Sequence, residues 1–527
     1  MLRRAWKPLT AGIATGGAGY YLYTSSARQT IDIPVKTVGE DGKAVMTSKQ
    51  FPLLTMKVVN ERLNQNATSE TVHRPYGVTW HHSTASLPSN DPIEDAHSHQ
   101  IIQKDTNPES DVPGDYLFFS VFDGHRGPET SQLLSRILIR AVALELSQLA
   151  SDVKKPLPNN GILHNLTSLV RPAKKSVSSP IEYGQGVPAA IEKVFTTLDW
   201  TLLNAPLEIL KETIKTQPKT DPIPDLSKHP MALKTMLPAI SGSCALMAIF
   251  DTAQRDLYVA CTGDSRAVAG AFVPGAEGKG VWSVDALSED QTGRNPNEAQ
   301  RIVSEHPKEE ADDVIRRGRI LGGLEPSRAF GDARYKWPAQ IQELLNQVFM
   351  VGNNMPLRKA PTTLKTPPYV TARPVVTHRK LSFDHPDSSL RFLVIATDGL
   401  WDALSSQEVV SLVGGHLAGL KGNIPKRDLP ALAPTVTGNA GIDGKEKRTK
   451  QEDGTWAFVD DNVSAHLIRN ALGGGDELSL RRLMSIPAPY SRRYRDDITV
   501  TVVWWEKGRE GDAQSTTVDS GPMKSKL

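Results

Sequence analysis

Cysteine is scarce in this sequence, and its scarcity excludes whole classes of cross-linked proteins. Only two of the 527 residues are cysteines, Cys244 and Cys261. Two cysteines cannot build a framework of several disulfides or a four-thiolate zinc site. Both lie in apolar stretches with the character of strands, so we expect buried free thiols.

Net charge is also small. The chain has 61 basic residues (Lys and Arg) and 59 acidic residues, which gives a formal net charge of +2. This balance gives no reason to expect nucleic acid or a strongly acidic partner. With 39% hydrophobic and 23% charged residues, the composition is that of a folded globular protein. The length allows about three domains, but one large β-rich domain with insertions fits as well.

Acidic residues are missing before Asp32. The same stretch, residues 1–31, is rich in Ser, Thr and Ala and carries four basic residues: Arg3, Arg4, Lys7 and Arg28. That composition is typical of a mitochondrial targeting segment. Leu9 to Tyr23 is uncharged but somewhat short for a membrane span. We therefore expect an import signal, with a membrane anchor inside it or a plain disordered tail as the alternatives.

The sequence ends in Ser525-Lys526-Leu527, which matches a peroxisomal address read by an import receptor. These residues close a polar stretch, 508–527, that predicts a disordered tail. A receptor needs an accessible end, so we expect a peroxisomal pool of the protein besides a mitochondrial one.

Pro-rich, Gly-rich and charge-rich stretches divide the rest of the chain. We expect a linker over residues 32–77 and one main domain over residues 78–507. Two loop insertions are expected inside this domain, at about 151–180 and 422–454, because both stretches are polar and punctuated by Gly or Pro, and we expect the second one to be disordered.

Carboxylates follow two apolar runs that predict buried strands. Residues 118–122 (FFSVF) lead directly into Asp123, and residues 391–396 (RFLVIA) lead through one threonine into Asp398. A strand that ends on an acid presents its carboxylate at the edge of a sheet. The two acids are therefore candidates for a shared site.

Gly124 and His125 follow Asp123 directly. Gly124 permits a backbone carbonyl to come close to whatever Asp123 binds, and His125 could exchange a proton at the same point. Taken alone, the stretch equally fits a turn with an aspartate cap and a surface histidine.

Further acids recur beside predicted strands: Glu94, Asp95, Asp264 and Asp496. Oxygen ligands without a Cys or His cluster suit hard divalent cations such as Mg²⁺ or Mn²⁺. Two such ions a few ångströms apart are a known device for phosphoryl chemistry. His97 and His99 alternate as exposed strand residues do, so we do not expect them to be ligands.

One stretch points to a different chemistry. Residues 263–267 (GDSRA) differ by one residue from the G-x-S-x-G turn of serine hydrolases. That turn needs a helix after its serine, whereas residues 267–273 have the pattern of a strand. The pattern therefore argues against a serine hydrolase.

Seven short motifs occur in an order that is similar to one enzyme family. They are Glu94-Asp95, Asp123-Gly124-His125-x-Gly127, Ser241-Gly242-Ser243, Gly263-Asp264-Ser265-Arg266, Ser327-Arg328-x-Phe330-Gly331-Asp332, Asp398-Gly399-Leu400-Trp401-Asp402 and Asp496-Asp497-Ile498-Thr499-Val500. From about Val78 to Trp505 the chain resembles the metal-dependent type 2C serine/threonine protein phosphatases. The resemblance implies an α+β fold, a sandwich of two antiparallel β-sheets flanked by helices, with metal ions in a cleft at one end.

The resemblance also implies roles for the acids. Asp123 would bridge two Mg²⁺ or Mn²⁺ ions, with Asp398 and Asp496 completing the first site. Glu94 and the backbone carbonyl of Gly124 would serve the second, with Asp95 orienting bound water. Asp264 and Asp402 would hold a weaker third ion.

The same resemblance implies that His125 protonates the leaving serine or threonine oxygen. The nucleophile would be a metal-bridging hydroxide, so no phosphoenzyme is expected. The alternative is a scaffold that binds partners without turnover, but this would need a degraded metal site, and every acid of the family pattern is present.

Asn90 departs from the common pattern of the family. Many members have an arginine at this place, four residues before the motif glutamate, where it grips the substrate phosphate. The run Asn90 to Asp95 (NDPIED) instead resembles the mitochondrial pyruvate dehydrogenase phosphatase branch. This implies that Asn90 lies at the substrate and that the substrate is the E1α subunit of pyruvate dehydrogenase, with another mitochondrial or peroxisomal phosphoprotein as the alternative. Cys244 also departs, since a threonine is common there.

Overall fold

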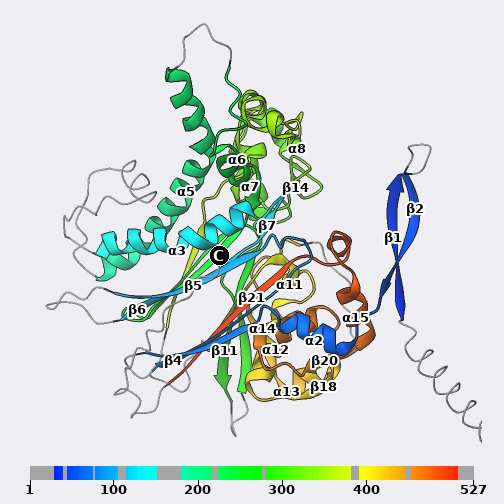
Figure 1. The fold of residues 1–527 in the computed structure, drawn as a ribbon. Helices are drawn as coiled ribbons and strands as arrows, with labels where there is room; N and C mark the ends of the chain where they lie inside the picture. Colours follow the sequence, from blue (N-terminus) through cyan, green and yellow to red (C-terminus); the bar gives the residue numbers. More distant parts are fainter. Residues whose placement is uncertain are drawn as a thin grey trace, which may run out of the picture.

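Two β-sheets form the centre of the protein (Figure 1). The computed structural model describes residues 29–38, 44–74, 78–104, 114–150, 180–216, 223–275, 280–381, 391–445 and 453–507. The five-stranded sheet has the order β16-β10-β9-β6-β5: β16 (Val375–Lys380), β10 (Asp256–Thr262), β9 (Ala245–Asp251), β6 (Asp115–Phe122) and β5 (Ala96–Gln103).

The second sheet has seven strands in the order β19-β12-β11-β17-β21-β4-β3. They are β19 (Thr435–Asn439), β12 (Gly280–Ala286), β11 (Arg266–Pro274), β17 (Phe392–Ala396), β21 (Ile498–Lys507), β4 (Val78–Leu87) and β3 (Thr68–Arg74). Neighbouring strands in both sheets are antiparallel, except that β19 runs parallel to β12. The expected sandwich of two largely antiparallel sheets is confirmed.

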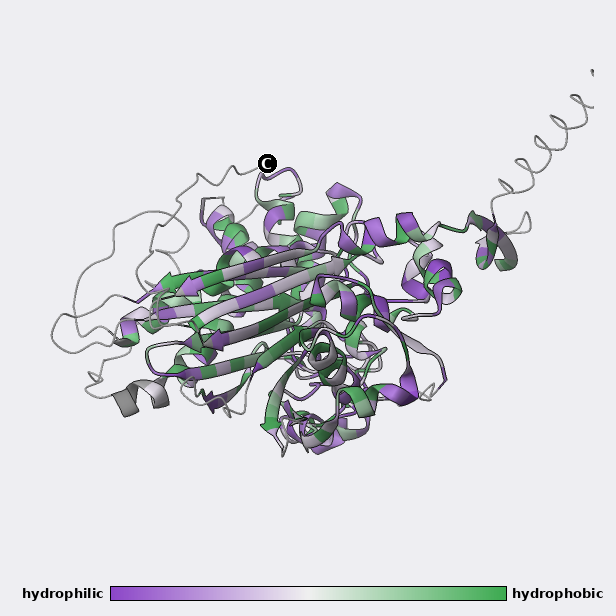
Figure 2. Cartoon of the chain, turned by 90° about the horizontal axis from the view of Figure 1, so that it is seen from below, coloured by the Kyte–Doolittle hydropathy of each residue, from purple (hydrophilic) through white to green (hydrophobic). Residues whose placement is uncertain are grey.

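Alternation along the strands explains why the sheets stack. Apolar and polar residues alternate along many strands (Figure 2), and successive side chains of a strand point to opposite faces. On β6, Phe119 points into the layer between the sheets, whereas Phe118 points to the helices outside. In the inner layer Trp80 of β4 meets Phe250 of β9, with ring centroids 5.1 Å apart.

Helices cover both outer faces of the sandwich. Helices α3 (Glu129–Ala150) and α5 (Pro180–Thr216) pack on the five-stranded sheet (Figure 1). The seven-stranded sheet is covered by α2 (Met56–Asn64), α11 (Asp398–Trp401), α12 (Ser406–Leu417), α14 (Val463–Ala471) and α15 (Glu477–Ser485). The fold is thus four layers deep, and the polar ends of the strands emerge at its two ends.

Shorter α-helices and strands connect these larger elements. They are α6 (Ala232–Ile240), α7 (Pro296–Ser304), α8 (Ala311–Val314), α9 (Ala333–Lys336), α10 (Ala339–Leu345), α13 (Leu429–Leu432), the pair β13 (Ile315–Arg316) and β14 (Arg319–Ile320), the pair β18 (Gly422–Pro425) and β20 (Thr455–Phe458), and the small sheet β15 (Phe330–Gly331), β8 (Gly242–Ser243) and β7 (Gly124–His125).

An N-terminal hairpin of β1 (Thr30–Val38) and β2 (Ala44–Pro52) lies against the segment that follows α15. Ile33 and Val35 pack against Ile486. The Arg493 guanidinium donates a hydrogen bond to the Pro34 carbonyl at 3.0 Å. The hairpin therefore supports the residues that lead into β21.

Two sequence predictions about connecting segments are wrong. The expected linker, residues 32–77, contains most of the hairpin, which begins at Thr30, and also α2 and β3, and β3 is a full strand of the seven-stranded sheet. The expected disordered insertion, residues 422–454, contains β18, α13 and β19. Polar composition misled both predictions because these strands lie at sheet edges, where few side chains are buried.

Other predictions about segments lie outside the described residues. These are residues 1–28 of the targeting segment predicted over 1–31, including Leu9 to Tyr23, residues 151–179 of the loop predicted over about 151–180, and the tail over residues 508–527. Within the described ranges, no helix combines the length and the apolar character needed to cross a membrane.

Candidate active site

The predicted acids converge where strands of both sheets end. Asp123 follows β6, Asp398 follows β17 as the first residue of α11, and Asp264 lies in the turn between β10 and β11. One carboxylate oxygen of each of these three residues lies within 4.8 Å of those of the other two. The structure therefore brings together acids that are far apart in the sequence.

Asp123 is the electrostatic centre of this group. Burial raises the pKa of its carboxyl well above the ordinary value, and repulsion from four carboxylates adds to the effect: Asp398, Asp95, Asp264 and Asp496. Like charges that share a buried site disfavour one another's ionised form. A divalent cation at this point would remove that repulsion.

The carboxyl groups of the neighbouring acids also have raised pKa values. Burial and the Asp398 carboxylate raise the pKa of Asp496 to about 7. Burial raises the pKa of Asp264 to about 6, although the ammonium of Lys445 acts in the opposite direction. Carboxyl groups with such pKa values bind protons readily unless a cation replaces the proton.

Glu94 and Asn90 are held together by Asp497. The Asp497 carboxylate accepts hydrogen bonds from the backbone N–H of Asn90 and of Glu94, both at 2.9 Å. It also accepts the side-chain amide of Asn90 at 3.0 Å, and the same amide donates to Glu94 at 3.2 Å. Asn90 therefore orients Glu94 in this structure, and its predicted contact with a substrate stays a prediction.

Gly124 has a steric reason to be glycine. A Cβ atom at this position would overlap the backbone carbonyl oxygen of Glu94. The absence of a side chain lets the chain after Asp123 approach the segment that carries Glu94 and Asp95. Asp95 is buried and accepts a hydrogen bond from the Thr397 hydroxyl at 2.8 Å.

His125 pairs with Asp332. Its Nε2 lies 2.6 Å from Asp332 Oδ2, and Asp332 is fully buried. Burial disfavours the charged imidazole, but the carboxylates of Asp332, Asp264 and Glu94 together outweigh burial and raise the pKa of His125 above 6.5. Asp332 also adopts a left-handed backbone with φ of 52°, a conformation that costs energy in a residue with a side chain.

Gly242 makes room for this pair. A Cβ atom there would overlap both His125 Nε2 and Asp332 Oδ2. Replacing Gly242 by alanine is expected to lower hydrolysis of a phosphoserine peptide by about 10²-fold, the lower end of a general acid's contribution, because the imidazole is displaced.

A suitable control is Gly184→Ala, where the new Cβ would come no closer than 3.6 Å to a neighbouring atom, the Tyr258 hydroxyl. Turnover and melting temperature of both variants should be measured. Normal turnover of folded Gly242→Ala protein would contradict the proposed steric role.

Two cations at the site were missed by the sequence analysis. The Lys445 ammonium, only 9% exposed, lies 2.7 Å from Asp398 Oδ2, 3.5 Å from Asp402 Oδ1 and 3.9 Å from Asp264 Oδ2. The Arg492 guanidinium pairs with Asp496. Lys445 lies in the stretch that was predicted to be a disordered insertion, so the sequence did not indicate that its side chain reaches the site. Arg492 lies four residues before Asp496, a spacing that could have indicated an ion pair.

Cys244 and Cys261 are both buried free thiols, as predicted. The Cys244 thiol donates a hydrogen bond to Asp264 Oδ1 at 3.2 Å. Ser265 is followed by strand β11 and not by a helix, so the turn of a serine hydrolase is absent from this place.

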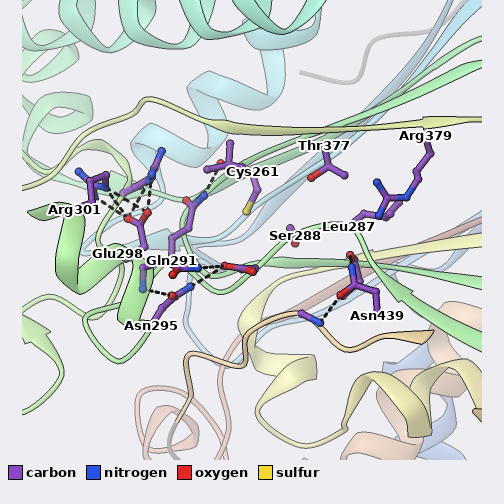
Figure 3. Close-up of a pocket in the computed structure, with 16 residues that line it drawn as sticks. Cys261, Leu287, Ser288, Gln291, Asn295, Glu298, Arg301, Thr377, Arg379 and Asn439 are labelled. Atoms are coloured by element: carbon purple, nitrogen blue, oxygen red, sulfur yellow. Dashed lines mark hydrogen bonds and ion pairs between the residues drawn. The ribbon is translucent and has the colours of Figure 1, made fainter. Parts of the chain in front are cut away.

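A cavity of about 480 Å³ is lined by residues that include Cys261, Gln291 and Glu298 (Figure 3), and none of the clustered acids is among its lining residues. Glu298 and Arg301 are ion-paired at its wall at 2.7 Å. Gln291, also in the wall, accepts a hydrogen bond from the Gly263 backbone at 2.7 Å. This wall therefore supports the turn that carries Asp264.

Comparison with known proteins places this site in a family. Residues 203–427 match the family described as Protein phosphatase 2C. The chain is 37% identical over 489 residues to the mitochondrial [pyruvate dehydrogenase [acetyl-transferring]]-phosphatase 1 of Saccharomyces cerevisiae, covering 90% of this chain and 76% of that protein. The chain belongs to the protein phosphatase 2C family. It is a protein serine/threonine phosphatase of the branch that includes this yeast enzyme.

Other members of the protein phosphatase 2C family are similarly close. A protein phosphatase 2C homolog of Schizosaccharomyces pombe is 34% identical over 511 residues, covering 94% of each chain. The human mitochondrial [pyruvate dehydrogenase [acetyl-transferring]]-phosphatase 1 is 32% identical over 443 residues, covering 79% of this chain and 76% of that one. A crystal structure of serine-threonine phosphatase 2C from Toxoplasma gondii matches with a TM-score of 0.36 at 15% identity, covering 91% of this chain and all of that one, too weakly to support an argument.

The donor set fits the metal dependence of this family. The converging ligand atoms of Asp123, Asp264 and Asp398 are all carboxylate oxygens, and their mutual repulsion calls for positive charge. Such oxygens suit Mg²⁺ and Mn²⁺.

Proposed function

We propose that this protein phosphatase acts in mitochondria on phosphoserine of the E1α subunit of pyruvate dehydrogenase. The observation that supports the chemistry is the convergence of four other carboxylates on Asp123. The substrate is proposed from the names of the yeast and human relatives, which act on pyruvate dehydrogenase, and from the run that begins at Asn90.

We further propose that two divalent cations, Mg²⁺ or Mn²⁺, bind at this centre. Asp123, Asp398 and Asp496 would hold one ion, and Asp123, Glu94 and the Gly124 carbonyl the other. Asp264 and Asp402 would hold a weaker third ion, and Asp95 would orient bound water. When bound, the ions would activate water and neutralise phosphate charge.

His125 is the proposed general acid. Because Nε2 is paired with Asp332, the proton that His125 would donate to the serine oxygen as the phosphoester bond breaks is the one on the other ring nitrogen, Nδ1. Asp332 would keep the imidazole protonated and correctly oriented, since its carboxylate already lies 2.6 Å from Nε2.

A deletion experiment tests the proposed substrate. Cells that lack this protein are expected to accumulate phosphorylated E1α, measured by quantitative phosphopeptide mass spectrometry. Restoring the intact chain should reverse the rise, and restoring an Asp123→Asn variant should not. If E1α phosphorylation stays unchanged while other phosphopeptides rise, the substrate is a different phosphoprotein.

Lys445 should weaken metal binding because its ammonium lies among the proposed ligands. Two unit charges 4 Å apart repel by about 4 kcal/mol at an effective dielectric constant of about 20. Replacing Lys445 by glutamine is therefore expected to lower the Mg²⁺ concentration for half-maximal activity by about tenfold or more.

Activity should be titrated with Mg²⁺ for both proteins and for Lys445→Arg, the control that keeps the charge. An unchanged Mg²⁺ requirement in Lys445→Gln would show that the ammonium leaves the site when the ion binds.

A second, peroxisomal pool stays a prediction from the Ser525-Lys526-Leu527 motif. The names of the yeast and human relatives indicate a mitochondrial location and do not mention peroxisomes. Contact with a membrane through residues 1–31 likewise stays a prediction.

A further inference from the structure

Three side chains outside the active site form a second cluster of metal-binding type. Glu70 lies on β3, His82 on β4 and His99 on β5, and one ligand atom of each lies within 4.8 Å of those of the others. Glu70 and His82 face each other directly across the antiparallel pair β3–β4. His99 comes from the other sheet, so the cluster joins the two sheets at one edge of the sandwich.

The distances match the geometry of a zinc ion. The His82 Nε2 lies 3.4 Å and the His99 Nε2 lies 3.6 Å from Glu70 Oε2. Ligand atoms that bind a tetrahedral zinc at about 2.0–2.1 Å lie roughly 3.3–3.4 Å from one another. A zinc ion therefore fits between the three atoms with only small shifts of the side chains.

The polar atoms of the buried His82 ring are poorly satisfied by the described residues. Its side chain is 2% exposed, and neither ring nitrogen makes a hydrogen bond of good geometry with any of them, although Nε2 lies 3.4 Å from the Glu70 carboxylate. The ring lies against Phe119 in the inner apolar layer, with centroids 5.2 Å apart. A buried polar group without a partner is costly, and a metal ion bound at Nε2 would remove part of that cost.

The protonation state of His82 also favours binding. Burial and the neighbouring His99 lower the pKa of His82 to about 4. The ring is therefore neutral at physiological pH and offers a lone pair, which is the form that ligates metals.

We infer that Glu70, His82 and His99 form a binding site for a divalent transition metal ion, Zn²⁺, distinct from the carboxylate centre. Two imidazoles and one carboxylate suit zinc, whereas Mg²⁺ prefers oxygen ligands alone. Three protein ligands leave a fourth position for water, which Glu70 can admit because its side chain is half-exposed. The ion would fasten β3 and β4 to β5, the strand that begins directly after Asp95. The prediction that His99 is no ligand is thereby revised.

The chemistry of the two sites allows them to be separated in one experiment. The intact chain is stripped of metal with a chelator, and excess Mg²⁺ is added to fill the carboxylate centre. Co²⁺ is then titrated as a visible probe, since four-coordinate Co²⁺ absorbs strongly, and Zn²⁺ is used to displace it. The expected result is one Co²⁺ per chain, displaced by Zn²⁺ but not by Mg²⁺.

Variants show which residues bind the ion. His99→Gln and Glu70→Gln should each lower the affinity for Co²⁺ by more than about 100-fold. Losing a residue that only hydrogen-bonds to a metal ligand lowers metal affinity by at most about 100-fold, and the loss of a ligand should cost more. Both side chains are partly exposed, so these variants are expected to fold. His73→Gln is the matched control, because His73 lies on β3 but points to the opposite face from Glu70 and bonds to Thr79 at 3.1 Å.

Two outcomes would overturn the inference: equal Co²⁺ affinity in the intact protein and His99→Gln, or displacement of Co²⁺ by Mg²⁺. The Mg²⁺-dependent hydrolysis of an aryl phosphate by His99→Gln should stay at the level of the intact protein. The failure of the zinc site and the failure of the proposed phosphatase mechanism are therefore seen in different measurements.

Discussion

Replacing Asp123 by asparagine is expected to lower phosphatase turnover by about a thousandfold or more, a larger effect than that of any other single acid in the site. Losing one preorganised group that stabilises transition-state charge costs about 10²–10³-fold, and Asp123 interacts with four other carboxylates at once. Asparagine has nearly the same shape, so Asp398 can still donate its backbone hydrogen bond at 3.3 Å. The variant removes the charge with little change to the fold.

The control for this variant is Asp402→Asn. Asp402 lies at the rim of the cluster with its side chain 32% exposed, 3.5 Å from the Lys445 ammonium. Its loss is expected to shift the Mg²⁺ requirement and to leave turnover at saturating Mg²⁺ close to normal. Turnover of both variants should be measured across a range of Mg²⁺ concentrations, alongside circular dichroism. Substantial turnover of Asp123→Asn at any concentration would exclude Asp123 as the central ligand.

Replacing His125 by alanine is expected to affect substrates unequally. A general acid contributes about 10²–10⁴-fold, and it matters most when the leaving oxygen is strongly basic. Hydrolysis of a phosphoserine peptide should fall by this factor. Hydrolysis of an aryl phosphate, whose leaving group needs little protonation, should fall far less. An equal loss on both substrates would assign His125 to binding or structure.

The partner residue supplies the matching control. Asp332 raises the pKa of His125 above 6.5, so the imidazole stays protonated at higher pH than an isolated histidine. Activity on phosphoserine should fall as the pH rises through this raised pKa. Asp332→Asn removes the carboxylate charge, so the fall should move to lower pH. An alkaline limb that does not move in Asp332→Asn would mean that another group titrates.

The sequence predicted those site residues whose position follows from the pattern of their immediate neighbours in the chain. An apolar run that ends on an acid predicted both Asp123 and Asp398, and the structure places both at the cluster. The sandwich came from the resemblance to a family, since periodicity alone does not say which strands pair. β4 and β21 are about four hundred residues apart in the sequence, yet Thr84 and Thr501 are direct neighbours.

The features that were missed depend on contacts between distant segments. Lys445 follows a polar, Gly-rich stretch, and its packing depends on the turn at Asp290, whose carboxylate accepts the Gly444 backbone N–H at 3.2 Å. His97 and His99 have the spacing of exposed strand residues, but His99 is half-buried, and the sequence cannot show that a histidine of the other sheet faces it. Both errors arose because a side chain was interpreted from its own strand or loop alone.

The N-terminal hairpin sets a limit on proteolytic trimming of this protein. A cut before Gln29 would leave β1 and β2 in place. A cut beyond β1 would uncover Ile486 and remove the carbonyl that Arg493 uses. The residue just before Arg493, Arg492, pairs with Asp496 in the carboxylate cluster. A protease that removes the hairpin would therefore lower the activity of the enzyme, although it cuts the chain outside the two-sheet sandwich that carries the active site.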